Sequence, residues 1–61
     1  MDKFVRITVI GKLGNTAERV FNSRYIKAID EEEGTVLLEG NKKPFRITSE
    51  SMVGLLKVLG V

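Results

Sequence analysis

The stretch "FNSRYIKAID" (residues 21–30) contains the sharpest change of pattern in this chain. Its Asn-Ser pair is typical of a turn, whereas the residues that follow are typical of a strand. We therefore predict a corner at residues 22–24, able to hold a single helical turn, and a strand over residues 25–32. Alternation along this strand predicts two faces, one with Ile26 and Ala28 and the other with Tyr25, Lys27 and Ile29.

The residues before this corner predict a β-hairpin. The segment "FVRITVI" (residues 4–10) alternates apolar and polar side chains and is rich in β-branched residues, as in a strand with one buried face. That face consists of Val5, Ile7 and Val9. The segment "GKLGN" (residues 11–15) has two glycines and an asparagine and predicts a turn, after which residues 16–21 return as a second strand.

The residues after the corner predict two more strands. Gly34 is the expected turn residue before a short fourth strand at residues 35–39, and Gly40-Asn41 is the expected tip of the next turn. Residues 45–47 predict the fifth strand. Because Pro44 has no N–H to donate, this fifth strand is expected either to lie at a sheet edge or to begin at that point.

The last part of the chain predicts its single helix. Ser49 is the expected N-cap, and Glu50 lies in the first turn, where the helix dipole favours an acid. An apolar stripe recurs at helical spacing through Met52, Leu55, Leu56 and Leu59. Lys57 and Gly60 are expected stop signals. The whole series predicts one α+β domain over residues 1–61, with a small, twisted, mostly antiparallel sheet of about five strands and one C-terminal helix.

The size of the chain favours self-association. Sixty-one residues form a small core, and domains of this size usually need disulfides, a metal or a partner chain. The sequence has no cysteine and no histidine, which excludes disulfides and removes the two best zinc ligands. A homo-oligomer is the remaining common solution.

The predicted helix offers a surface for such an oligomer. Val53 and Val58 flank its apolar stripe, so that the apolar arc covers about 220°, more than the roughly 100° needed to dock on one sheet. The predicted interface consists of Met52, Val53, Leu55, Leu56, Val58 and Leu59. The alternative is a helix that lies in the curved sheet of its own subunit.

Catalysis is not expected, because the commonest general base, histidine, and the strongest nucleophile, cysteine, are both missing. No cofactor is predicted. The acidic run at residues 30–33 is expected to be a solvated hairpin end rather than a metal site, since neighbouring acids on a strand point to opposite faces.

The basic residues predict a possible ligand surface. Arginines beside an aromatic ring can hold phosphates or stack on bases. The candidates for binding a nucleotide-like ligand or nucleic acid are Arg6, Arg19, Arg24, Tyr25 and Lys27, with Arg6 and Arg19 expected to pair across the first hairpin. The alternative is a solvated sheet face, with Lys42 and Lys43 protecting a sheet edge from aggregation.

Residues 19–59 resemble the FlbD family of small flagellar and motility proteins. The residues that carry the resemblance are Val20-Phe21-Asn22, Ile26, Ile29-Asp30, Glu33-Gly34, Val36-Leu37-Leu38, Gly40, Lys42-Lys43, Ile47, Glu50-Ser51 and residues 53–56. Ser23 stands where the family pattern often has proline. The resemblance implies that Ile26 and Ile29 are both core residues, and it implies a role in protein–protein contacts.

A second resemblance is to the C-terminal half of the LytTR DNA-binding domain, through Tyr25-Ile26-Lys27 and the strand pair that follows. Glu50 stands where that domain has a basic residue next to its last helix, which weakens the implied DNA binding.

We therefore expect a cytoplasmic protein without membrane insertion that works as a homo-oligomer and binds a protein partner. The alternative is a binder of a nucleotide-like ligand or of nucleic acid, including a phage-type inhibitor that sequesters its target.

Overall fold

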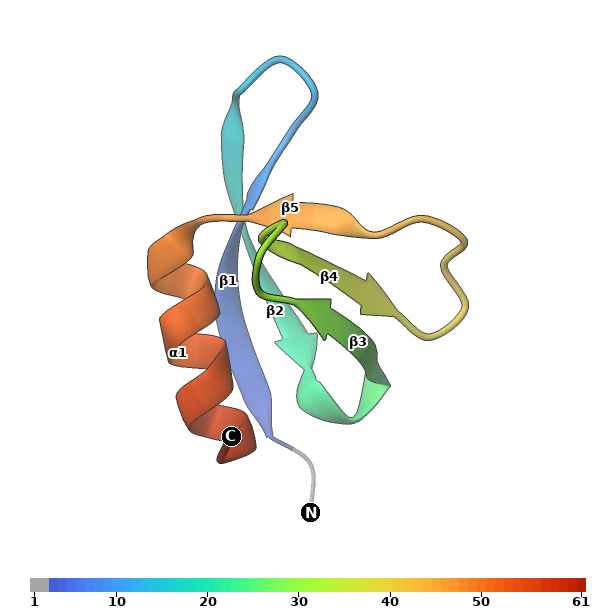
Figure 1. The fold of residues 1–61 in the computed structure, drawn as a ribbon, viewed down its shortest axis with the longest axis vertical. Helices are drawn as coiled ribbons and strands as arrows, with labels where there is room; N and C mark the ends of the chain where they lie inside the picture. Colours follow the sequence, from blue (N-terminus) through green and yellow to red (C-terminus); the bar gives the residue numbers. More distant parts are fainter. Residues whose placement is uncertain (1–2) are drawn as a thin grey trace.

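A five-stranded antiparallel sheet and one α-helix make up the computed structural model, which describes residues 3–61 (Figure 1). The elements are β1 (Phe4–Ile10), β2 (Thr16–Asn22), the 3-10 turn η1 (Ser23–Tyr25), β3 (Ile26–Asp30), β4 (Thr35–Leu38), β5 (Phe45–Ile47) and α1 (Ser49–Leu59). The strand order is β2-β1-β5-β4-β3. The predicted fold class is confirmed.

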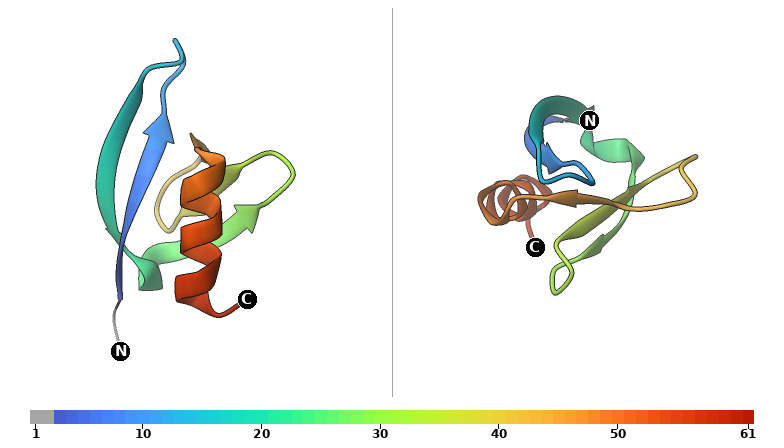
Figure 2. Two further views of the ribbon diagram at one scale, coloured as in Figure 1. Left: turned by 90° about the vertical axis from the view of Figure 1, so that its left-hand side faces the viewer. Right: turned by 90° about the horizontal axis from the view of Figure 1, so that it is seen from above.

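The corner η1 joins the two outermost strands of this order. The backbone N–H of Ser23 donates to the Lys3 carbonyl at 2.7 Å, and the N–H of Glu39 donates to the Tyr25 carbonyl at 2.7 Å. The corner is therefore attached to the sheet at both of its ends. The Asn22 side chain accepts a hydrogen bond from the Arg24 N–H at 3.1 Å, which caps the short turn. Held in this way, the sheet is strongly bent (Figure 2).

The pairing of β3 with β4 contains a β-bulge. Ile26 pairs with Leu38 and Ala28 pairs with Leu37, so Lys27 is the extra residue. A bulge reverses the alternation that follows it, and Ile26 and Ile29 consequently both pack against the core. The simple alternation predicted for this strand is therefore wrong, because Ile26 and Ile29 are both partly buried against the core.

The core lies between the inner face of the bent sheet and α1, which packs against β1 (Figure 1). Within residues 3–61 the buried side chains are Val5, Ile7, Val36, Ile47, Met52 and Leu55. Three strands and the helix therefore share one small core. Burying an aliphatic side chain of this kind contributes roughly 1.5–3 kcal/mol.

The first turn of α1 is hydrogen-bonded to β1. The N-cap is Thr48, whose hydroxyl accepts from the Ser51 N–H at 3.2 Å, so the prediction of Ser49 was wrong by one residue. The Ser51 hydroxyl oxygen in turn accepts from the Thr8 N–H at 2.8 Å. The start of the helix therefore satisfies the backbone groups of Thr8, which directly precedes the part of β1 that pairs with β5. The helix ends at Gly60, with φ of 77°, as predicted.

β5 is a central strand, with β1 on one side and β4 on the other. Pro44 directly precedes it, so the strand-start interpretation is correct and the edge-strand interpretation is wrong. Lys42 and Lys43 lie in the loop before β5, not on the edge strands β2 and β3, and so they protect no sheet edge.

Candidate functional site

The inner face of the sheet is open beyond the helix-covered core. A hollow of about 400 Å³ lies there between the β1–β2 hairpin and strands β4 and β5, and we call it the aromatic hollow. Its walls include Val9, Ala17, Arg19, Phe21, Leu38 and Phe45. Five of these six side chains are apolar, which is typical of small-ligand sites.

Two aromatic rings form one wall of this hollow. Phe21 of β2 and Phe45 of β5 are stacked, with ring centroids 5.3 Å apart and an angle of 25° between the ring planes. Both are half-buried and pack against the core cluster. The two rings therefore pack against the core on one side and line the hollow on the other.

Arg19 brings a positive charge to the aromatic hollow. In the β1–β2 register Arg19 is opposite Ile7, and Phe21 is opposite Val5. Directly opposed residues of antiparallel strands point to the same face, so Arg19 extends from the inner face beside Phe21. The ten residues that line the hollow include no acid, and Arg19 is the one charged residue among them.

Two amide side chains lie at the rim, Asn15 at the end of the hairpin loop and Asn41 in the β4–β5 loop. The Gly11 N–H donates to the Asn15 carbonyl at 2.7 Å and closes the hairpin loop. A Cβ on Gly11 would lie 2.5 Å from the Asn15 side-chain oxygen. Glycine at position 11 therefore leaves room for the amide of Asn15 beside the hollow.

The predicted ligand-binding residues do not form one site. Arg6 is opposite Val20 in the hairpin register and points to the outer face, whereas Arg19 points to the inner face. The predicted pairing of Arg6 with Arg19 is therefore wrong, because the register offsets the two residues by one position. Lys27 is the bulged residue of β3.

Arg24 and Tyr25 form a separate surface at the corner η1. The Arg24 guanidinium carbon lies 5.8 Å from the centre of the Tyr25 ring, within the range of a cation–π contact. Tyr25 is about half exposed. Of the five predicted residues, the structure thus brings Arg24 and Tyr25 together and places Arg19 in the aromatic hollow.

Sequence reasoning missed Phe21, Phe45, Asn15 and Asn41 as residues of a possible site, and assigned them to strands and turns. One signal was available, because Arg19 and Phe21 are two positions apart on a strand and so share a face. Phe45 could not be placed beside them without the order of the strands.

The six residues of the predicted helix interface are divided by the structure. Met52 and Leu55 are buried in the core of the subunit itself, whereas Leu56, Val58 and Leu59 are partly buried against it. Val53 is 55% exposed. Of the six residues, Val53 is therefore the most accessible to a partner chain, whereas Met52 and Leu55 lie inside the subunit.

Val53 borders a second hollow of about 390 Å³, which we call the helix groove. The groove lies between α1 and the β3–β4 turn, and its apolar side is formed by Ile47, Met52, Val53 and Leu56. Glu31, Glu32 and Glu33 lie on its other side. The groove therefore combines an apolar wall with an acidic rim.

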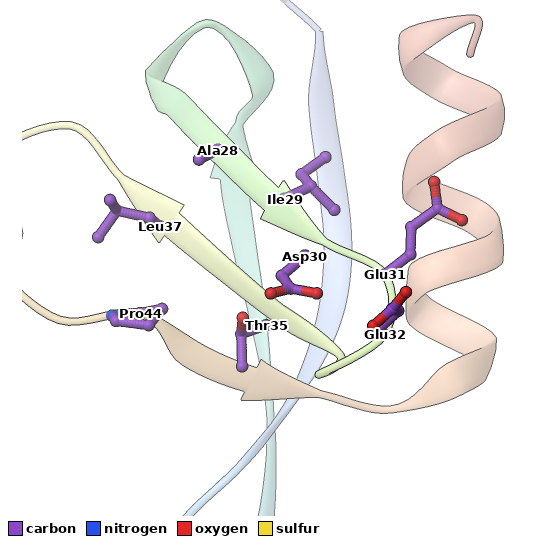
Figure 3. A pocket seen from close by; sticks show the side chains of 8 residues that line it. All are labelled: Ala28, Ile29, Asp30, Glu31, Glu32, Thr35, Leu37 and Pro44. Atoms are coloured by element: carbon purple, nitrogen blue, oxygen red, sulfur yellow. The ribbon is translucent and has the colours of Figure 1, made fainter.

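The acidic run itself forms a turn. The Asp30 carboxylate accepts from the Glu33 N–H at 3.0 Å, and the Asp30 carbonyl accepts from the Gly34 N–H at 2.9 Å. Asp30, Glu31 and Glu32 also line a broad hollow of about 670 Å³ on the outer face of β3 and β4 (Figure 3). Within residues 3–61, no three His, Cys, Asp or Glu side chains are grouped to hold a metal ion.

The one α-helix in the described part of the chain is too short to cross a membrane. Comparison of the chain with known proteins gave no match to a family model, to a curated protein or to a solved structure. The FlbD and LytTR resemblances stay predictions.

Proposed function

We propose that this chain is a non-catalytic cytoplasmic protein that assembles with itself and acts through protein–protein contacts. The observation that carries the proposal is the surface area of the subunit. The lack of cysteine in the chain agrees with an intracellular setting, since small secreted domains usually depend on disulfides.

The subunit exposes more surface than its mass requires. Its accessible surface is 4790 Å², whereas a monomer of 6.8 kDa is expected to expose about 4,000 Å². The difference of roughly 800 Å² leaves room for an interface of standard size, in which each partner buries about 800 Å². The radius of gyration, 10.7 Å, is close to the value of about 10.5 Å expected for a folded domain of this length. The chain is also elongated, with principal-axis extents of 35 × 24 × 21 Å, and the projecting β1–β2 hairpin accounts for part of the excess (Figure 1).

The exposed flank of α1 is the surface that we propose for self-association. Val53 is exposed there, and Leu56, one turn further along the helix, lines the same groove. The acidic rim at Glu31–Glu33 would discourage two copies from docking by this rim alone, because like charges repel. We therefore expect the apolar wall, and not the rim, to lie at the centre of the interface.

Two exposed valines provide a matched test. Val53 on α1 is 55% exposed and Val20 on the outer face of β2 is 56% exposed. Replacing either with aspartate removes the same apolar area and adds the same charge. Molar mass would be measured by light scattering during size-exclusion chromatography at micromolar concentration, with circular dichroism to verify the fold.

The proposal expects an oligomer for the unchanged chain, dissociation to 6.8 kDa subunits for Val53→Asp, and no dissociation for Val20→Asp. A monomeric unchanged protein would refute self-association. Dissociation by Val20→Asp alone would move the interface to the outer face of the hairpin. Leu56→Asp is less suitable, because Leu56 packs against the core and its replacement would also destabilise the subunit.

A further inference from the structure

We propose that the aromatic hollow is a binding site for a mononucleotide, with the base against Phe21 and Phe45 and the phosphate at Arg19. This site is distinct from the helix groove, and its occupation does not depend on self-association. Three features of the hollow support this class of ligand: its charge, its aromatic wall with the amide rim, and the strands that form its floor.

The charge of the hollow selects an anion. Arg19 is its one charged lining residue, and no acidic residue lines it. The residue opposite Arg19 in the β1–β2 register is the apolar Ile7. A guanidinium presents parallel N–H donors that match a phosphate group. Placed two positions from Phe21 on the same face, it lies beside the aromatic wall.

The aromatic wall and the rim suit a planar base. Nucleic-acid bases stack on aromatic side chains, and this stacking tolerates different bases. Asn15 and Asn41 each carry an amide with donors and an acceptor, which can pair with the edge of a base. The volume of about 400 Å³ lies within the range of roughly 300–1,000 Å³ that is usual for small-ligand sites.

The strands that line the hollow argue against an extended peptide. A peptide strand binds by pairing with a free sheet edge. Here β1 is paired with β2 on one side and, at Val9 and Ile10, with β5 on the other. β5 and β4 also have a partner strand on each side, and β2 has its free edge on the side away from β1. A ligand that lies on β1, β5 and β4 therefore meets mainly side chains, which favours a small molecule.

The experiment is a titration of the isotope-labelled protein with AMP, CMP, GMP and UMP, followed by two-dimensional NMR. We expect saturable binding with Kd below the millimolar range and shifts centred on Arg19, Phe21, Asn41 and Phe45. Adenosine and inorganic phosphate, tested separately, are each expected to bind at least tenfold more weakly than AMP. Base and phosphate would then both contribute.

Arg19→Gln is expected to weaken AMP binding at least tenfold and to leave adenosine binding unchanged. Arg6→Gln is the matched control, because Arg6 lies on the same hairpin but on the opposite face. Phe45→Leu keeps an apolar side chain at position 45, and it is expected to weaken AMP and adenosine by the same factor. Circular dichroism of each variant would separate lost binding from lost folding.

Four outcomes would overturn the proposal. They are no saturable binding of any of the four nucleotides at millimolar concentration, equal AMP affinity in the unchanged protein and Arg19→Gln, shifts centred on Arg24 and Tyr25, and intermolecular NMR contacts that place a second copy in the hollow. The last of these would make the hollow part of the interface between subunits.

Discussion

The two halves of β1 carry similar side chains and have different surroundings. Val5 and Ile7 in the first half lie under α1 and are buried. Val9 and Ile10 in the second half pair with β5, and both line the open aromatic hollow. An 11-residue helix is about 16 Å long, whereas a seven-residue strand is about 24 Å long.

With the proposed nucleotide site, one inner face would serve two purposes. The helix begins beside Thr8 and runs back along the first half of β1, and this covered part contributes to the core (Figure 1). The second half of β1 is also apolar, but the helix does not cover it. Stability is therefore expected to depend on the first half of β1, and recognition on the second.

The largest expected effect comes from Ile7→Ala, compared with Val9→Ala on the same face of the same strand. Ile7 is 1% exposed, and its truncation is expected to cost about 2–5 kcal/mol of the free energy of unfolding. Val9 is half-buried, so its truncation is expected to cost roughly 1 kcal/mol. Urea denaturation at equal protein concentration measures both, and equal losses would contradict the division of β1.

A smaller effect is expected from Ser51→Ala, which tests how α1 is attached to the covered half. The Ser51 hydroxyl oxygen accepts from the Thr8 N–H and lies 3.0 Å from the Thr48 hydroxyl. Removing the Ser51 hydroxyl leaves the partly buried Thr8 N–H without its acceptor, and this is expected to lower the free energy of unfolding by about 1–3 kcal/mol. Ser49→Ala, at an exposed position, is the control and is expected to have little effect. Urea denaturation measures both variants. Equal stability of Ser51→Ala and Ser49→Ala would contradict a stabilising role for this hydrogen bond.

Replacing Gly60 or Gly54 in the helix region with alanine is expected to change the stability of the domain in opposite directions. Gly60 has a φ of 77°, and Gly60→Ala is expected to destabilise the domain by about 1 kcal/mol. Gly54 lies within the helix, and a Cβ added there would have no neighbour within 4 Å outside the backbone of the helix, so Gly54→Ala is expected to stabilise the domain by roughly 0.5–1 kcal/mol. The shifts in Tm would show the signs. Destabilisation by Gly54→Ala would indicate that another chain approaches the helix closely at this position.

The smallest expected effect on stability comes from Arg19→Gln in the uncovered half. Arg19 is exposed, and its replacement is expected to change the free energy of unfolding by less than about 0.5 kcal/mol. The same denaturation measurement is the check. A loss similar to that of Ser51→Ala would mean that Arg19 supports the fold, which would contradict its assignment to recognition.

Local patterns in the sequence were sufficient to predict most of the fold. The alternation at residues 4–10, the glycine turns and the helical stripe each depend on neighbours in the chain, and these elements are observed. The bulge at Lys27 and the central position of β5 depend on which strands pair. No local pattern contains that information.

The candidate site was less predictable for the same reason. The side of the hairpin that Arg19 faces depends on the β1–β2 register, and its neighbour Phe45 comes from a strand far along the chain. The width of the apolar arc on α1 was predicted, but how much of it the subunit buries itself depends on how the sheet bends. Only the assembled sheet shows that Met52 and Leu55 belong to the core.

The central position of the short strand β5 has a consequence for the order of folding. The β1–β2 and β3–β4 hairpins each join neighbouring segments and can form early, but isolated hairpins are only marginally stable in water. β5 pairs with β1 and with β4, and it therefore connects the two hairpins. Its pairing with β1 closes a loop that contains most of the chain, which is an entropically slow step. The two hairpins and the helix are thus expected to become stable together in one cooperative transition, when three residues near the end of the chain reach their place.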